Sequence, residues 1–366
     1  MEIRLSPQTS SAVSSQSPFA RRAITGPLFL DPRGGMRSCL AVCSLLTSVR
    51  SVVIEPRMPI AAALRSRHCS TTQMSLPEGL ETRYAEIAAA QSQQEQKYAE
   101  WIATSEVDGE ALRASASSLG LDLDIAAGTI KYASDFESKR LPLCFDFVYC
   151  RHGKTTGNTE PRVYQGYVDE PSNALNEVGI AQAQDAADKL DALALDPALI
   201  VLSPLSRAAE TGLAFVRRHP DLEERVEYWE DAAEMRFGSW DNMMVKDLDD
   251  DNICHLFYLT QNAVVKSALP YVRPSDGAEF DAENFVEMAT RMHSVLQRLD
   301  DKMRPVAEKR GEPPLVVVYG HSMAGAALSI LTGNGKQVDG ESYLGFDGKY
   351  IMPNATPVFL HQTSTA

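Results

Sequence analysis

Arginine and histidine side chains follow apolar segments of this 366-residue chain, at positions where buried strands would end. Arg151 and His152 come directly after the run from Phe145 to Cys150, which is rich in aromatic and β-branched residues. Ligands of open α/β sheets bind at the carboxyl ends of strands. A guanidinium grips two oxygens of a phosphoryl group, and an imidazole attacks or relays protons. The pair therefore suits phosphoryl chemistry, and Gly153 lets the backbone turn close to such a ligand.

Three later segments supply companions to this pair. VLSPLSRAAET at 201–211 contributes Arg207, AAEMRFGSW at 232–240 contributes Glu234, and VVVYGHSMAG at 316–325 contributes His321 after another predicted strand. In this order the segments resemble the histidine phosphatase superfamily, which has the phosphoglycerate-mutase-like fold. The resemblance extends from about residue 143 to the C-terminus, and its joint specificity is high because each motif supports the others.

The resemblance implies a role for each of these side chains. His152 is expected to attack phosphorus and form a phosphohistidine. Arg151 and Arg207 are expected to hold the phosphoryl oxygens, and His321 to stabilise the transition state. Glu234 is expected to protonate the leaving alkoxide and then to deprotonate water.

Some assignments rest on shorter matches. Asp231 is an alternative to Glu234 as the general acid. The start of a predicted helix at Ser322 favours an anion. The positions that we expect to contact substrate are Gly153, Asn158, Gln165, Gly166 and Ser322.

Two departures from the family pattern concern the choice of substrate. Lys154 stands where a Glu or Gln commonly follows the glycine. Met235, Arg236 and Phe237 precede Gly238, whereas phosphoglycerate mutases of this type carry Glu-Arg-His-Tyr-Gly around the acid. The sequence therefore favours a phosphatase acting on a small phosphomonoester such as a sugar phosphate or a phosphorylated glycolytic acid. A phosphomutase remains the alternative.

Two other function classes are compatible with single features of the sequence. GHSMAG also resembles the nucleophile elbow of α/β-hydrolases, with Ser322 as nucleophile and Asp339 or Asp347 and His361 as its partners. Too little chain follows Ser322 for the strands and helices that carry such partners, and the arginine motifs would have no role. A non-catalytic binding protein would be expected to lack one of the catalytic side chains, and all are present here.

Strands and helices are predicted to alternate from Phe145 onward, with strands near 198–203, 226–229, 315–320 and 355–362 and helices near 176–193, 207–218, 280–303 and 322–331. This order predicts an α/β fold, a three-layer α/β/α sandwich with a mostly parallel sheet and an N-terminal helical extension. The predicted divisions are a leader at 1–75, the extension at 76–140 and the catalytic domain at 141–366. Asp108 is predicted to cap a second helix of the extension.

Charge separates the leader from the rest of the chain. Residues 1–75 carry nine arginines, no lysine and three acidic residues, a charge of +6, so the remainder carries −20 of the total of −14. The acidic body disfavours a nucleic-acid or anionic-membrane surface. The leader is typical of mitochondrial import, and a downstream start with a cytoplasmic protein is the alternative. Its apolar patch is interrupted by Arg50 and is too short to span a membrane.

Neither a metal nor a cofactor is expected from the sequence. The six cysteines form no CxxC pair and no disulfide framework, and the histidines lack metal-ligand spacing. DLDDDN at 247–252 resembles the start of a calcium loop, yet Asn252 replaces the required glycine and Tyr258 the bidentate acid. We interpret it as a solvated acidic turn. The sequence carries no signal for an oligomeric state.

Overall fold

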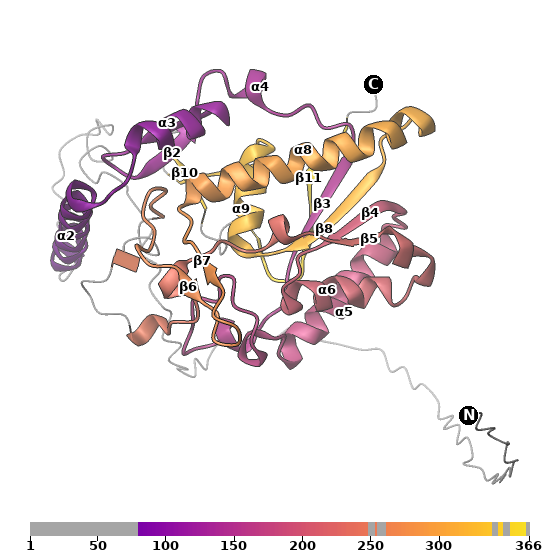
Figure 1. Ribbon diagram of the computed structural model, residues 1–366, viewed down its shortest axis with the longest axis horizontal. Helices are drawn as coiled ribbons and strands as arrows, with labels where there is room; N and C mark the ends of the chain where they lie inside the picture. The colour runs from indigo at the N-terminus through magenta and orange to yellow at the C-terminus, as the bar shows by residue number, and fades with distance from the viewer. Residues whose placement is uncertain (1–79, 248–252, 255–260, 339–342, 347–351, 364–366) are drawn as a thin grey trace, which may run out of the picture. The chain divides into compact units, whose positions relative to one another are not determined.

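The computed structural model describes residues 80–247, 253–254, 261–338, 343–346 and 352–363 (Figure 1). The chain divides into the units Met1–Val52 and Val53–Ala366, and all described residues belong to the second. The predicted leader at 1–75, most of the acidic turn at 247–252, and Asp339 and Asp347 lie outside the described residues.

A five-stranded sheet forms the centre of the described unit, in the order β11-β3-β8-β4-β5. Strands β3, β8, β4 and β5 are parallel, and β11 pairs antiparallel with β3 at one edge. The predicted mostly parallel sheet is therefore confirmed. The strands are β3 (Asp146–Arg151), β4 (Pro197–Leu202), β5 (Val226–Tyr228), β8 (Leu315–Gly320) and β11 (Pro357–His361).

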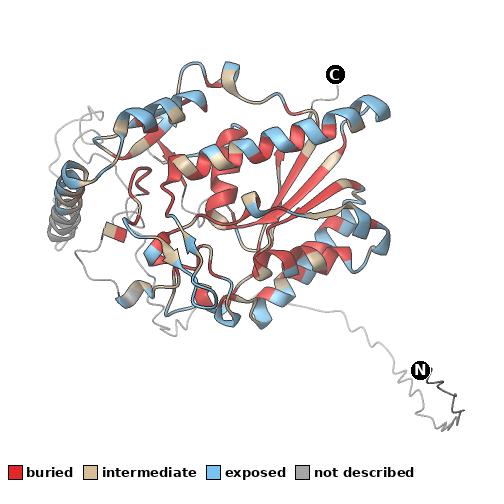
Figure 2. Ribbon diagram, viewed as in Figure 1, coloured by how far each residue is buried: buried red, intermediate tan, exposed pale blue. Residues whose placement is uncertain are grey.

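Helices cover both faces of this sheet (Figure 1). Val148 and Cys150 of β3 belong to a core cluster with side chains of α5 and α6, whereas Phe147 and Tyr149 belong to a second cluster with α8 and α9. Alternate side chains of a strand point to opposite faces, so a sheet buried on both faces needs a continuous apolar strand. Figure 2 shows strands β3, β4 and β8 buried over most of their length. The helices are α5 (Glu177–Ala192), α6 (Ser206–Val216), α8 (Phe285–Arg310) and α9 (Ser322–Leu331).

Helix α8 begins later than the predicted start near residue 280. Asn284 is its N-cap and forms a capping box with Glu287, because the Asn284 side chain accepts from the Glu287 amide while the Glu287 carboxylate accepts from the Asn284 amide. This reciprocal pair ends the preceding loop and starts the helix. The helix then crosses the sheet with a buried apolar face.

The N-terminal extension contains helices and a hairpin. Helix α2 spans Leu80–Thr104, and α3 spans Gly109–Ser118 behind the predicted cap Asp108, whose carboxylate accepts from two backbone amides of the first turn. The pattern of helix-forming residues gave no indication of the antiparallel hairpin that follows. Its strands and the next short helix are β1 (Leu121–Asp124), β2 (Thr129–Tyr132) and α4 (Phe136–Lys139).

Short elements fill the connections between the main layers. Two small antiparallel pairs are β6 (Tyr271–Val272) with β7 (Glu279–Phe280), and β9 (Lys336–Gln337) with β10 (Leu344–Gly345). The 3-10 helices are η1 (Thr156–Asn158), η2 (Pro171–Asn173), η3 (Pro220–Arg225), η4 (Glu230–Ala232), η5 (Gly238–Trp240) and η6 (Val245–Asp247). Among the described residues, no helix has the length and hydropathy that a membrane span requires.

Candidate active site

The two histidines meet because β3 and β8 are neighbours in the sheet. Arg151 pairs with Gly320 at the carboxyl ends of these strands, and the His152 amide donates to the Gly320 carbonyl oxygen over 2.9 Å. The strand register therefore places His152 beside His321. Their ring centroids lie 5.3 Å apart.

The His152 imidazole is held in one tautomer. Its Nδ1 lies 2.7 Å from the Gly153 carbonyl oxygen, which can only accept, so Nδ1 carries the proton and Nε2 carries the lone pair. Burial, followed by the charges of Arg207 and Arg151, holds the pKa of His152 well below its ordinary value. The ring is therefore neutral at physiological pH and has a nucleophilic nitrogen available.

His321 is fixed through its backbone and its ring. Its amide donates to the Tyr149 hydroxyl over 2.6 Å, and that hydroxyl donates to the His321 carbonyl oxygen over 2.8 Å. Its Nε2 lies 2.7 Å from Ser203 Oγ, and its buried Nδ1 has no partner within the described part of the chain. Burial and the charge of Arg207 lower the pKa of His321 well below its ordinary value.

Both arginines lie at the same end of the sheet and are anchored by carbonyl oxygens. Arg151 Nη1 donates to Met352 O over 3.0 Å. Arg207 donates from Nη1 to Val168 O over 2.9 Å and from Nη2 to Gly166 O over 2.6 Å. Burial lowers the pKa of Arg207 to about 10, so the guanidinium keeps its charge at neutral pH. One buried positive charge, on Arg207, and one half-buried positive charge, on Arg151, therefore act on the His152 ring.

The loop after β3 brings the predicted contact residues Asn158 and Gln165 together. Thr155 and Asn158 form a capping box at η1, with the Asn158 amide 3.1 Å from Thr155 Oγ1. Thr155 Oγ1 donates to Gln165 Oε1 over 2.9 Å. The Gly153 amide, in turn, donates to Thr211 Oγ1 of α6 over 3.0 Å.

The carboxylate of Glu234 lies at the N-terminus of α9, the helix that begins directly after His321. Its Oε1 accepts from the amides of Met235 at 2.9 Å, Met323 at 3.2 Å and Ala324 at 3.1 Å. A carboxylate is favourable at a helix N-terminus, where backbone N–H groups have no partner in the helix. This arrangement brings Glu234 next to Ser322 and its helix.

Asp231, the alternative acid, lies elsewhere. Its carboxylate is 3.3 Å from Arg298, and the side chains of this pair are about half exposed at 47% and 53%. Asp231 is not among the residues that line the cavity in front of His152. The structure therefore separates the two candidate acids.

A cavity of about 110 Å³ opens in front of His152. Of the ten predicted site residues, eight line it, and Gly153 and His321 are buried behind the wall. The cavity is smaller than the pockets of about 300–1,000 Å³ that hold drug-sized ligands, so it suits a small metabolite. The predicted residues in its wall are Arg151, His152, Asn158, Gln165, Gly166, Arg207, Glu234 and Ser322, and the others are Arg162, Val163, Tyr164, Phe237, Val245, Gln261, Met323 and Phe346.

Sequence reasoning missed residues that support the site from behind. Asp241 is buried, and burial raises the pKa of its carboxyl well above the ordinary value. Its Oδ1 accepts from the Phe237 amide over 3.3 Å. Gly166 has φ +44°, and a Cβ atom there would overlap Asp241 Oδ1. Asp241 directly follows the segment AAEMRFGSW at 232–240, and this position was its signal in the sequence.

The described residues do not form the triad of an α/β-hydrolase. His361 pairs with Phe147 near the start of β3, whereas Ser322 follows the end of β8 beside Arg151. Four strand residues separate these positions, about 13 Å at the rise of a strand. Ser322 and His361 therefore lie at opposite ends of the sheet, and the nucleophile-elbow alternative is wrong. Within the same residues, no group of three or more His, Cys, Asp or Glu could hold a metal ion.

Comparisons with known proteins agree with this geometry. The model of the histidine phosphatase superfamily (branch 1) matches residues 147–337. The mannitol-1-phosphatase of Eimeria tenella is 44% identical over 303 residues, which are 78% of this chain and 96% of the relative. The chain belongs to the histidine phosphatase superfamily. The predicted family is confirmed, and this histidine phosphatase is a phosphoric monoester hydrolase acting on a small phosphorylated metabolite.

Solved structures of lower similarity were also found. A mycobacterial hydrolase is 26% identical, with a TM-score of 0.41, over 51% of this chain and 80% of that chain. Mycobacterial glucosyl-3-phosphoglycerate phosphatase in complex with VO3 is 24% identical, with a TM-score of 0.44, over 58% of this chain and 89% of that chain. Membership of the histidine phosphatase superfamily rests on the sequence matches rather than on these two likenesses.

Proposed function

We propose that this histidine phosphatase hydrolyses a sugar-alcohol phosphate through a phosphohistidine on His152. The observation that carries the proposal is the hydrogen bond between His152 Nδ1 and Gly153 O, at 2.7 Å, which leaves Nε2 with its lone pair. Arg151 and Arg207, which line the same cavity, would hold the phosphoryl oxygens and neutralise their charge.

The reaction proceeds in two displacements. In the first, Nε2 of His152 forms a bond to phosphorus while the bond from phosphorus to the ester oxygen breaks, and Glu234 gives its proton to the departing oxygen. In the second, Glu234 takes a proton from water, the water oxygen attacks phosphorus, and the N–P bond breaks to release phosphate. The two displacements use only the phosphoester, one water molecule, His152 and Glu234.

The remaining predicted residues are assigned to binding. His321 stabilises the transferring phosphoryl group together with the two arginines. Asn158 donates to a phosphoryl oxygen, and Gln165, Gly166 and Ser322 contact the ligand from the cavity wall. Gly153 lets the backbone after His152 lie close to the backbone of Gly179, because a Cβ atom at position 153 would overlap the Gly179 carbonyl oxygen.

The substrate class comes from the cavity and from the relative. Polar and apolar side chains share the cavity wall, which suits a carbon chain bearing hydroxyl groups. The Eimeria relative that is 44% identical is a mannitol-1-phosphatase. We therefore place hexitol 1-phosphates first among the substrates.

Location and partners are a separate part of the proposal. The arginine-rich residues 1–75 support import into mitochondria, which fluorescence microscopy of the tagged full chain tests against a cytoplasmic signal. The acidic charge of the body supports the absence of a nucleic-acid partner.

Phosphate release and covalent labelling test the mechanism together. Wild type and His152→Ala are incubated with mannitol 1-phosphate in the presence of EDTA, and the protein is quenched and analysed for acid-labile phosphohistidine. We expect wild type to release phosphate and carry the label at His152, and the variant to do neither. Equal release by His152→Ala would contradict the proposal.

A further inference from the structure

Gln261 lines the same cavity as His152, although it lies between η6 and β6 in the chain rather than in the central sheet. Its side chain is buried, and Oε1 has no hydrogen-bond partner in the part of the chain that the structure describes. A buried amide oxygen without a donor carries a desolvation cost, which a bound donor would remove. The cavity wall therefore includes a residue whose buried amide oxygen neither the fold nor the proposed phosphoryl chemistry uses.

The backbone at Gln261 is held in an unfavourable conformation. Its φ is +52°, in the left-handed region that residues other than glycine rarely adopt. The next residue fixes the turn, because Asn262 Oδ1 accepts from the amides of Val264 at 2.9 Å and Val265 at 3.0 Å. Strain of this kind persists where surrounding contacts impose it, and it is frequent at ligand sites.

The N-terminal extension supplies one of these contacts. Ala263 donates its amide to the carbonyl oxygen of Gly128, in the β1–β2 hairpin, over 2.7 Å. Gly128 has φ +65°, and a Cβ atom there would overlap the Asn262 side chain. The hairpin thus packs against the turn that directs Gln261.

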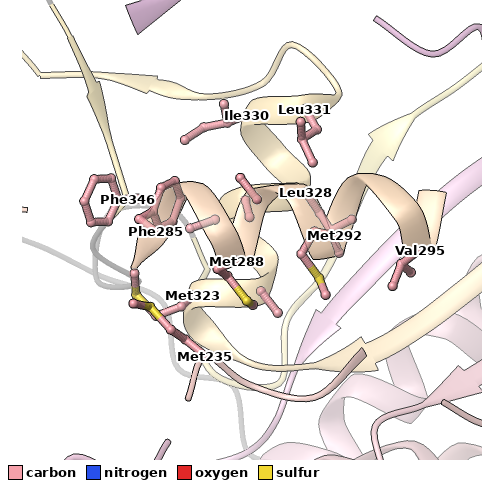
Figure 3. Packing of buried hydrophobic residues seen from close by; sticks show 14 of the residues in the cluster. Met235, Phe285, Met288, Met292, Val295, Met323, Leu328, Ile330, Leu331 and Phe346 are labelled. Atoms are coloured by element: carbon pink, nitrogen blue, oxygen red, sulfur yellow. The ribbon is translucent and has the colours of Figure 1, made fainter. Parts of the chain in front are cut away.

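Gly345 lies beside the Gln261 amide, and Phe346 contributes an apolar part of the wall of the same cavity. Gly345 presents no side chain, and a Cβ atom there would lie 3.0 Å from Gln261 Oε1. Phe346, which also lines the cavity, stacks on Phe285 with ring centroids 3.9 Å apart. Figure 3 shows Phe346 against Phe285, with Met323 beside Met235. A carbon chain can lie along this wall while a polar substituent reaches the amide.

We infer that Gln261 is a specificity-determining residue, whose Oε1 accepts a hydrogen bond from a hydroxyl group on the carbon chain of the phosphoester. The inference rests on the proposed function and adds a hydroxyl group to the phosphate as a feature of the substrate that the enzyme recognises. An amide oxygen only accepts, and a hydroxyl can donate to it whereas an ionised carboxylate has no proton to donate, so the oxygen favours a polyol over a phosphorylated acid. An ammonium group is disfavoured by the positive charges of Arg151 and Arg207 in the same cavity.

The test compares two phosphoesters with chains of the same length. Mannitol 1-phosphate carries hydroxyl groups along its chain, and n-hexyl phosphate carries none, so the ratio of their kcat/KM values reports hydroxyl recognition. Gln261→Met keeps the length of the side chain and removes the acceptor, while Gln261→Glu keeps an acceptor. Gln337→Met, on the exposed strand β9, is the matched control.

We expect the ratio to fall by about tenfold to a hundredfold in Gln261→Met, because the substrate hydroxyl loses its acceptor. Gln261→Glu should stay within about threefold of wild type in this ratio, since its charge repels the phosphate of both esters equally. Gln337→Met should leave both kcat/KM values unchanged. A ratio in Gln261→Met within about twofold of the control, or an equal fall in Gln261→Glu, overturns the inference.

The wild-type comparison separates this inference from the proposed function. If wild type cleaves hexyl phosphate as well as mannitol 1-phosphate, and His152→Ala cleaves neither, hydroxyl recognition is wrong while the phosphohistidine mechanism stands. If wild type cleaves neither ester and carries no phosphohistidine, the proposed function itself fails, and the inference fails with it.

Discussion

The hydroxyl of Tyr149 both accepts from the amide of His321, over 2.6 Å, and donates to its carbonyl oxygen, over 2.8 Å. Tyr149 is the third residue before His152 on the neighbouring strand. One buried side chain therefore connects the strand that carries the proposed nucleophile to the backbone of the second histidine.

Tyr149→Phe removes both hydrogen bonds and leaves the ring in place. We expect a loss of about 1–3 kcal/mol in the free energy of unfolding, because the His321 amide and carbonyl remain buried. The kcat value should fall with little change in KM, since His321 would no longer be held beside His152. Tyr319→Phe is the matched control, because the buried Tyr319 hydroxyl has no partner among the described residues. Equal effects of the two substitutions on kcat would contradict this account.

Gly166→Ala should disrupt the phosphate end of the cavity. A Cβ atom would overlap Asp241 Oδ1, and the Gly166 carbonyl oxygen that Arg207 binds would have to move. We expect kcat/KM to fall by about a hundredfold, since misplacing a catalytic charge is costly. Gly277→Ala has a similar backbone strain at φ +71° but open space around it. A loss of activity common to both variants would show that strain alone is responsible.

Glu234→Gln should slow phosphate release in a way that depends on the leaving group. We expect kcat for mannitol 1-phosphate to fall by about a hundredfold or more, because the alkoxide leaves without a proton. Hydrolysis of 4-nitrophenyl phosphate, whose leaving group is stable as an anion, should fall less. Asp231→Asn, outside the cavity, should leave both rates near wild type. Steady-state kinetics with the two esters would disprove the acid role if Glu234→Gln slowed both equally.

Stability should decrease as the pH falls below 6.5. The pKa values of His152 and His321 lie well below the ordinary 6.5, so the unfolded chain binds protons that the native protein does not. Each histidine then costs up to about 1.4 kcal/mol per pH unit between 6.5 and its native pKa, and nothing above 6.5. Asp241, whose pKa is raised by burial, has the opposite dependence above pH 3.8. The free energy of unfolding, measured with urea at several pH values between 7.5 and 5, should depend less steeply on pH in His152→Gln than in wild type. An equal dependence on pH in the two proteins would contradict the low pKa of His152.

The sequence predicted the residues at the strand ends better than it predicted their support. Arg151, His152, Arg207 and His321 follow apolar runs whose strand character is visible locally, and parallel strands bring their ends together. Tyr149 and Gln261 carry no local signal, because the groups that they face, His321 and the cavity wall, come from distant parts of the chain. Asp241 has one local signal, its position directly after the segment 232–240. The β1–β2 hairpin escaped prediction because its strands are only four residues each and follow a strongly helical segment.

Because β3 pairs with β8, hydrolytic activity should return late in refolding. Tyr149 and His321 are 172 positions apart in the chain, so neither half of the protein can hold both rings. Such distant pairings carry a loop-closure cost and form slowly compared with helices. After dilution from denaturant, far-ultraviolet circular dichroism should therefore recover before hydrolysis does, and the delay measures how long the central strands take to find each other.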